Sequence, residues 1–131
     1  MANINWWAVI VSTISAFVLG GIWYAPRVFG NTWLRESGVD ISHKKSHSVM
    51  VFSSAFVLAL IAAIAFAYLI GARASLGYAI SVGLIVGIGW IATSFGVNYL
   101  FAQRSLKLFL IDAGYHAVQF LLYGIIFGLW H

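Results

Sequence analysis

The sequence predicts an all-α integral membrane bundle of four transmembrane helices, forming a single domain over residues 1–131. Hydrophobic residues make up 63% of the chain and charged residues only 8%, whereas charged residues make up about 25% of an ordinary soluble domain. Four apolar stretches are each long enough to cross a hydrocarbon core of about 30 Å; they cover residues 6–24, 49–70, 76–101 and 108–130. Because these stretches are continuously apolar rather than alternating, and because four strands cannot close a barrel, we expect helices.

The first helix is expected to end before Pro26, which lacks an amide donor and clashes with the preceding turn. Residues 27–36 then interleave apolar and polar side chains, a pattern typical of a short helix that lies in the membrane interface. Gly38 can close this short helix, and Ser42 is a candidate N-cap for a second helix that begins in water before it enters the membrane. We expect one group of aromatic and basic side chains to contact the lipid interface: Trp23, Trp33, Arg27, Arg35, Lys44 and Lys45.

The distribution of basic residues predicts an orientation. The first and third gaps between the apolar stretches together hold six of the seven basic residues, and the second gap holds only Arg73. Because cytoplasmic loops carry an excess of Lys and Arg, we expect both termini outside and the first and third loops inside. The chain is therefore predicted to be a multi-pass membrane protein, with lipid headgroups as partners of its loops.

Composition also excludes several classes of function. The chain has no cysteine, so disulfides, thiolate metal sites and cysteine nucleophiles are absent. The basic residues avoid the apolar stretches, a pattern typical of loops against anionic headgroups rather than of a nucleic-acid patch. One aspartate and one histidine within an apolar stretch are too few ligands for a metal site. We therefore expect no nucleic-acid partner, no metal and no cofactor.

The fourth apolar stretch carries the strongest candidate site. At 100° per residue, Asp112, His116, Gln119 and Tyr123 fall within about 60° of one another and form one polar stripe. A carboxylate and an imidazole are costly within a membrane and need partners, and at a spacing of four residues each is the nearest candidate for the other. The stripe is either a polar network that determines helix packing or a site for a ligand, a proton or an ion.

Two other helices present stripes that can face this one. In the third, Gly83 and Gly87 share a stripe with Ser94 and Asn98, and we predict a hydrogen bond between Asn98 and Asp112. The first helix has a small and polar stripe that ends at the same level, so the three stripes can surround a pocket open to the cytoplasm. The second helix is almost wholly apolar, and we expect it to pack or to face lipid and to contribute little chemistry. The candidate ligand- or proton-binding residues are Asp112, His116, Asn98, Gln119, Tyr123 and Tyr24, and the candidate helix-packing glycines are Gly20, Gly83, Gly87, Gly124 and Gly128.

The run GGIWYAPRVFGNTW at residues 20–33 resembles the signature of a bacterial membrane family filed as domain of unknown function 1761. The resemblance extends over the whole chain, with Asn98 and Tyr99 at the end of the third helix, RSLKL at residues 104–108 and DAGY at residues 112–115. It implies four membrane helices and no assigned activity.

Three functions are consistent with these features. We favour a non-catalytic membrane module that binds a lipid, a small molecule or a partner protein. The alternative is a small-solute or proton-coupled transporter or channel that uses Asp112 and His116, formed by a homo-oligomer because four helices enclose little volume. An enzyme is not expected, because the other three histidines lie outside the apolar stretches.

Overall fold

The computed structural model describes residues 4–39 and 49–130, and all the regular elements within these residues are helical. They are α1 (Trp6–Trp23), η1 (Pro26–Gly30), α2 (Asn31–Ser37), α3 (Val49–Ile70), α4 (Leu76–Leu84), η3 (Ile85–Ala92), α5 (Thr93–Phe101) and α6 (Leu106–Leu129). Four helical spans in the described residues are long and apolar enough to cross a membrane: Trp6–Trp23, Val49–Ile70, Leu76–Phe101 and Leu106–Leu129. The predicted fold class is confirmed.

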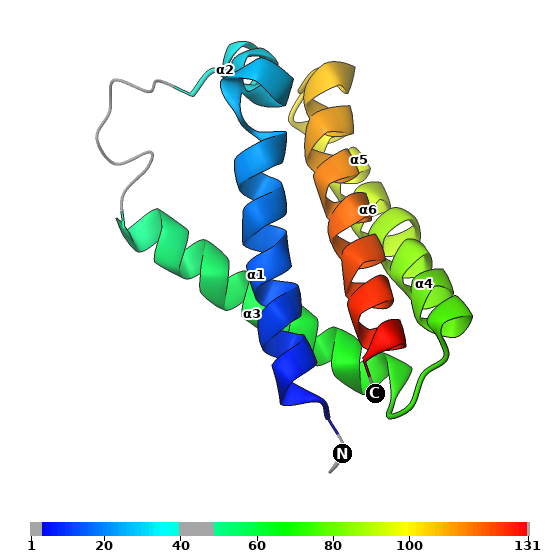
Figure 1. Cartoon of the computed structure of the whole chain (residues 1–131). Helices are drawn as coiled ribbons and strands as arrows, with labels where there is room; N and C mark the ends of the chain where they lie inside the picture. The colour runs from blue at the N-terminus through cyan, green and yellow to red at the C-terminus, as the bar shows by residue number, and fades with distance from the viewer. Residues whose placement is uncertain (1–3, 40–48, 131) are drawn as a thin grey trace.

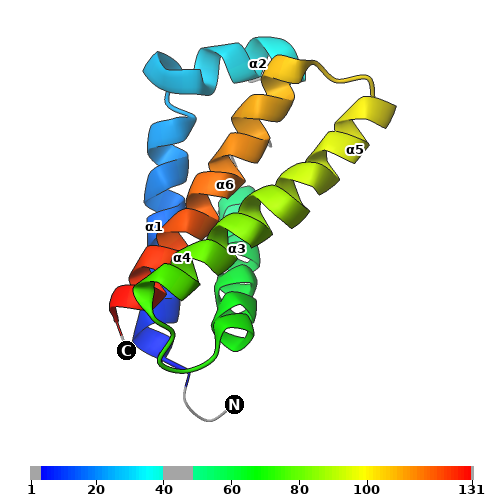
Figure 2. The same ribbon diagram turned by 90° about the vertical axis from the view of Figure 1, so that its right-hand side faces the viewer.

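The spans run alternately up and down. Both termini lie at one end of the bundle, and α2 lies at the other end together with the turn between α5 and α6 (Figure 1). The elements α4, η3 and α5 form one long rod that packs on α6 near the termini and diverges from it toward α2 (Figure 2). The bundle is therefore tight at the terminal end and more open at the end that carries α2.

Local sequence signals account for the helix boundaries. The side chains of Asn5, Ser75 and Ser105 each accept a hydrogen bond from a backbone amide three residues later, which caps α1, α4 and α6. Pro26 occupies the first position of η1 after α1 has ended, and Gly38 closes α2 with a left-handed φ of 72°. The short interfacial helix predicted over residues 27–36 corresponds to η1 and α2. The predicted cap at Ser42 and the basic side chains of Lys44 and Lys45 lie outside the described residues.

The last span, α6, is the central helix of the bundle, since it contacts α1, α2, α3, α4, η3 and α5. Near the terminal end, Phe66 of α3 packs against the rings of Phe120, Tyr123 and Phe127, with centroids 5.9–6.1 Å apart. Small residues of α1 and α4, including Ala8, Ala16 and Ala79, complete this buried cluster. The core therefore lies where α1, α3 and α4 converge on α6.

Glycines bring α4 and η3 into backbone contact with α6. A Cβ atom on Gly83 would lie 2.3 Å from the carbonyl oxygen of Phe120, and one on Gly124 would lie 2.6 Å from that of Ala79. In protein structures, a Cβ atom essentially never lies this close to a backbone oxygen of a neighbouring helix, so these two positions require glycine. A Cβ on Gly20 would lie 3.7 Å from the ring of Tyr115, an ordinary contact, and the close approach of α1 does not depend on that glycine.

Candidate functional site

The carboxylate of Asp112 collects three hydrogen bonds from side chains of three other segments. The Tyr24 hydroxyl donates to Oδ1 over 2.7 Å, the Trp33 indole nitrogen donates to the same oxygen over 3.0 Å, and the Tyr99 hydroxyl donates to Oδ2 through a short bond. Three neutral donors stabilise an anionic carboxylate without cancelling its charge. We call Asp112 and these three donors the Asp112 cluster.

The local fold explains how the donors converge. Tyr24 is the C-cap of α1, and a tight turn follows it, in which the Gly30 amide donates to the Ala25 carbonyl. A Cβ on Gly30 would lie 2.3 Å from the Tyr24 carbonyl oxygen, so only glycine lets α2 fold this closely over the end of α1. The turn brings Trp33 to Asp112.

The donor from the third span is Tyr99 and not Asn98, so the predicted hydrogen bond between Asn98 and Asp112 is wrong. The Asn98 side chain is exposed. The π-helical segment Ile85–Ala92 separates α4 from α5, and its i to i+5 hydrogen bonds include one more residue than an α-helical turn. The face of α5 that meets α6 is therefore shifted by about one residue: Phe95 and Tyr99 occupy the positions expected for Ser94 and Asn98.

His116 belongs to a second network. Its Nδ1 donates to Oε1 of Gln119 over 2.6 Å, the Gln119 amide donates to the Tyr123 hydroxyl over 2.9 Å, and that hydroxyl donates to the Ala59 carbonyl over 3.2 Å. This direction of donation assigns the proton to Nδ1 of the ring. Asp112 and His116, expected to be partners, share no hydrogen bond in the described part of the chain.

Aromatic rings separate the two networks. The His116 ring stacks on Phe95 at 5.1 Å and meets the edge of Tyr115 at 4.9 Å, while Tyr115 also lies 5.7 Å from Tyr24. The Tyr115 hydroxyl donates to the Ala16 carbonyl, which joins α6 to α1. The polar stripe predicted on the last helix is therefore divided between two sites with different partners.

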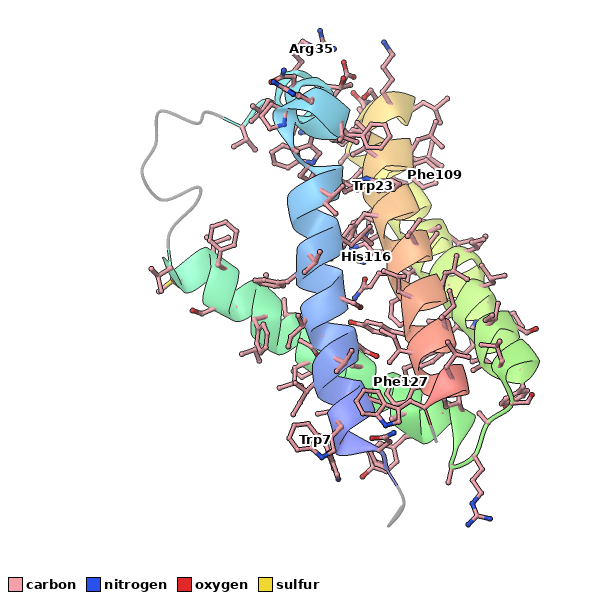
Figure 3. All side chains as sticks on the ribbon, in the orientation of Figure 1. Trp7, Trp23, Arg35, Phe109, His116 and Phe127 are labelled. Atoms are coloured by element: carbon pink, nitrogen blue, oxygen red, sulfur yellow. The ribbon has the colours of Figure 1, made fainter. Side chains whose placement is uncertain are left out.

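Two further contacts attach the α2 end of the bundle to α6 and its preceding turn. The Trp23 indole donates to the Ile111 carbonyl over 2.9 Å, and Figure 3 shows Trp23 and His116 between the ribbons of α1 and α6. The Arg104 guanidinium donates to the carbonyl oxygens of Glu36 and Ser37, the last residues of α2. A cation at the C-terminal end of a helix is favourable because free carbonyl groups gather there.

A cavity of about 750 Å³ adjoins the Asp112 cluster, between α1, α2, α3 and α6. Among the described residues, the polar groups in its wall are Tyr24, Trp33, Asp112 and Tyr115, and the rest of the lining is apolar or glycine. The beginning of α3 supplies apolar residues of this wall, Val51, Phe52 and Ala55, and α4 and α5 supply none of it. A second cavity of about 450 Å³ near the termini is lined by Arg73 and by none of the residues predicted to bind a ligand or a proton.

The remaining predicted residues lie as follows. Arg27 and Arg35 are exposed, and Arg35 donates to the Thr32 hydroxyl over 3.3 Å. Their contact with lipid stays a prediction. Sequence reasoning missed the roles of Tyr99 and Arg104 and placed Trp33 only at the lipid interface. In the described residues, no group of three His, Cys, Asp or Glu side chains could hold a metal ion.

Comparison with known proteins gives one family. The model of the family described as "Protein of unknown function (DUF1761)" matches residues 7–128. No curated protein and no solved structure matches the chain.

Proposed function

The chain belongs to the DUF1761 family of unknown function, and we propose that it is a non-catalytic membrane module that binds a small amphiphilic molecule. The observation that carries this proposal is the cavity of about 750 Å³ beside Asp112. Its volume falls within the range of about 300 to 1,000 Å³ that is typical of small-molecule sites.

The distribution of polar groups in the cavity favours an amphiphile over a uniformly polar solute. The side chains of Phe17, Leu34 and Ala55 belong to a largely apolar wall, whereas Asp112 and Tyr24 supply polar atoms. Burying an apolar chain against such a wall contributes roughly 25 cal/mol per Å². The apolar body of the ligand would lie along α1 and α3, and its polar head would lie at the Asp112 cluster.

The hydrogen bonds support a binding module more than a proton-coupled transporter. A relay along α6 would need Asp112 and His116 in one continuous path. Asp112 instead bonds to Tyr24, Trp33 and Tyr99, and His116 bonds to Gln119. In the transporter alternative, Asp112→Asn abolishes pH-coupled flux in liposomes, whereas a binding module shows no such flux in either form.

A cavity-filling substitution tests the proposal. Gly21 lines the cavity, and a Cβ built on it meets no atom within 4 Å, so Gly21→Leu places its side chain in the cavity without a clash at the backbone. Gly77→Leu is the matched control, because a Cβ there also meets nothing within 4 Å and Gly77 does not line the cavity.

The probe is dodecyldimethylamine oxide, a single-chain amphiphile without net charge at pH 8, and bound molecules are counted by native mass spectrometry of protein from nanodiscs. We expect Gly21→Leu to lower the bound fraction at least fivefold and Gly77→Leu to leave it unchanged. Equal binding by Gly21→Leu and the unchanged protein, or no binding by either, would overturn the proposal.

We further propose that the chain is a homo-oligomer of a bacterial inner membrane with both termini outside. The excess of basic residues in the first and third loops supports this orientation. Because the chain has no cysteine, single cysteines at the exposed positions Ala72 and Ala102 can report it. A membrane-impermeant maleimide added to intact spheroplasts should label Ala72→Cys and not Ala102→Cys; the reverse pattern contradicts the orientation. Native mass spectrometry of the same samples measures the oligomer.

A further inference from the structure

We propose that the cavity selects amphiphiles whose head is an organic ammonium group, held by the charge of Asp112 and by the rings of Tyr24, Trp33 and Tyr115. This inference rests on the proposed function and names the chemical class of its ligand. The wall of the cavity presents one carboxylate and three aromatic rings, and the side-chain donors of its described residues are already engaged.

The first argument is charge. Among the described residues that line the cavity, Asp112 is the only charged one, and it makes no ion pair in the described part of the chain. Its three hydrogen-bond donors are neutral. A negative charge within apolar walls attracts a cation more strongly than the same charge does in water, because the local dielectric constant is lower. A cationic head is therefore favoured and an anionic head is disfavoured.

The second argument concerns donors. The hydroxyl of Tyr24 and the indole nitrogen of Trp33 both donate to Asp112, and the hydroxyl of Tyr115 donates to the Ala16 carbonyl. The side-chain donors that the described residues place in the wall of the cavity are thus already engaged. A head that needs donors, such as a sugar, a phosphate or a carboxylate, would have to break these bonds. A tertiary or quaternary ammonium group needs no donor.

The third argument is the arrangement of the aromatic rings. The rings of Tyr24 and Trp33 lie 6.0 Å apart at an interplanar angle of 82°, and those of Tyr24 and Tyr115 lie 5.7 Å apart at 54°. All three rings belong to residues that line the cavity. Aromatic rings attract quaternary ammonium groups through their negative faces. The carboxylate of Asp112 lies among these rings and adds a full charge to them.

The size of the cavity indicates a ligand with one apolar chain. A volume of about 750 Å³ suits a drug-sized molecule. The apolar part of the wall extends from the Asp112 cluster along α1 and the first turns of α3. We therefore assign the occupant to the class of lipophilic ammonium compounds that combine a single chain or ring system with one amine.

The experiment compares two probes of nearly the same shape. Dodecyltrimethylammonium carries a positive charge, whereas dodecyldimethylamine oxide has no net charge at pH 8. Apparent dissociation constants are measured by native mass spectrometry of protein from nanodiscs of phosphatidylcholine, whose surface has no net charge and does not by itself concentrate the cation. For the unchanged protein we expect the cation to bind at least tenfold more tightly than the amine oxide. This comparison needs no variant and does not depend on the folding of one.

Variants locate the selectivity. Asp112→Asn keeps the size of the side chain and an acceptor oxygen, and it should reduce the preference for the cation to within threefold. Trp33→Leu should weaken cation binding more than Trp33→Phe, which retains a ring. Asn98→Ala is the control, because the Asn98 side chain is exposed and lies outside the cavity.

The outcomes separate this inference from the proposed function. If both probes bind with equal affinity, and Asp112→Asn changes neither, the cavity binds amphiphiles without selecting ammonium groups and the inference is wrong. If neither probe binds, the proposed function itself fails. Displacement of the cation by added phosphatidylethanolamine, at equimolar lipid, would show instead that an aminophospholipid occupies the cavity and would overturn the single-chain assignment.

Discussion

Substituting Gly124 by alanine should destabilise the bundle, because the added methyl group meets backbone atoms of α4. Its Cβ would lie 2.6 Å from the carbonyl oxygen of Ala79 and 2.9 Å from the Cα of Ile80, whereas ordinary contact begins at 3.4 Å. Neither atom can rotate away as the end of a side chain could. The two helices would therefore have to separate by roughly 0.8 Å at this point.

The cost can be bounded. Overpacking of a close-packed interface costs typically 1 to 3 kcal/mol, and the higher helix propensity of alanine offsets about 0.8 to 1 kcal/mol of this. We expect Gly124→Ala to lower the free energy of unfolding by up to about 2 kcal/mol. Gly20→Ala is the matched control: its Cβ would lie 3.7 Å from the Tyr115 ring, so only the propensity acts and stability should stay equal or rise.

Unfolding of both variants is measured by circular dichroism while sodium dodecyl sulfate is titrated into dodecyl maltoside micelles. If Gly124→Ala unfolds at the same detergent fraction as Gly20→Ala, α4 and α6 do not meet through bare backbone at Gly124, and the packing described above is refuted.

Three further predictions follow from single contacts. Tyr99→Phe removes one donor from Asp112 and should cost about 0.6 to 1.7 kcal/mol in the same unfolding assay, whereas Asn98→Ala should change stability by less than about 0.5 kcal/mol; similar values for both would contradict the shifted register of α5. Arg104→Ala removes the cation from the end of α2, so hydrogen exchange measured by mass spectrometry should accelerate in α2 and not in α1. Tyr123→Phe leaves the buried Gln119 amide without its acceptor and should cost about 1 to 3 kcal/mol; an unchanged transition would show that this bond does not contribute to stability.

The sequence predicts the spans well because their apolar runs are long and uninterrupted. The main difference at a boundary is the start of the last helix, which was expected at residue 108 and is found at Leu106. The hydropathy pattern excludes Lys107, yet the Ser105 side chain caps the helix in front of it. A hydropathy pattern marks the first residue of the apolar run, whereas the capping residue determines where the helical hydrogen bonds begin.

The sequence predicts the central residue of the candidate site, Asp112, but not two of its hydrogen-bond donors, Trp33 and Tyr99. Asp112 stands out because a carboxylate within an apolar stretch needs partners, and Tyr24 falls at the same level of the bundle. Tyr99 could not be found by placing residues at 100° steps, because η3 shifts the register by about one residue and apolar sequence gives no sign of a π-helical segment. The bond from Trp33 depends on the turn at Gly30, whose close approach to Tyr24 only the folded chain shows.

The contribution of α3 to the cavity illustrates a different limit. Almost every residue of α3 is apolar, so no face of the helix is marked by its sequence. Which face meets α1 depends on how the helix crosses its neighbours, and Figure 1 shows α3 crossing α1 near the termini and diverging from it toward its own beginning. Because the sequence of α3 has no polar stripe, it does not indicate how α3 crosses α1.

The central position of α6 has a consequence for how the protein is made. Every helix that it contacts precedes it in the chain, so during synthesis these helices are made before the element around which they pack. Until α6 inserts, Tyr24, Trp33 and Tyr99 lack their common acceptor, and the glycines of α4 face no partner. Assembly of the bundle should therefore be a single late event, and a chain interrupted before residue 106 should remain a loose set of inserted helices, which cellular proteases can recognise.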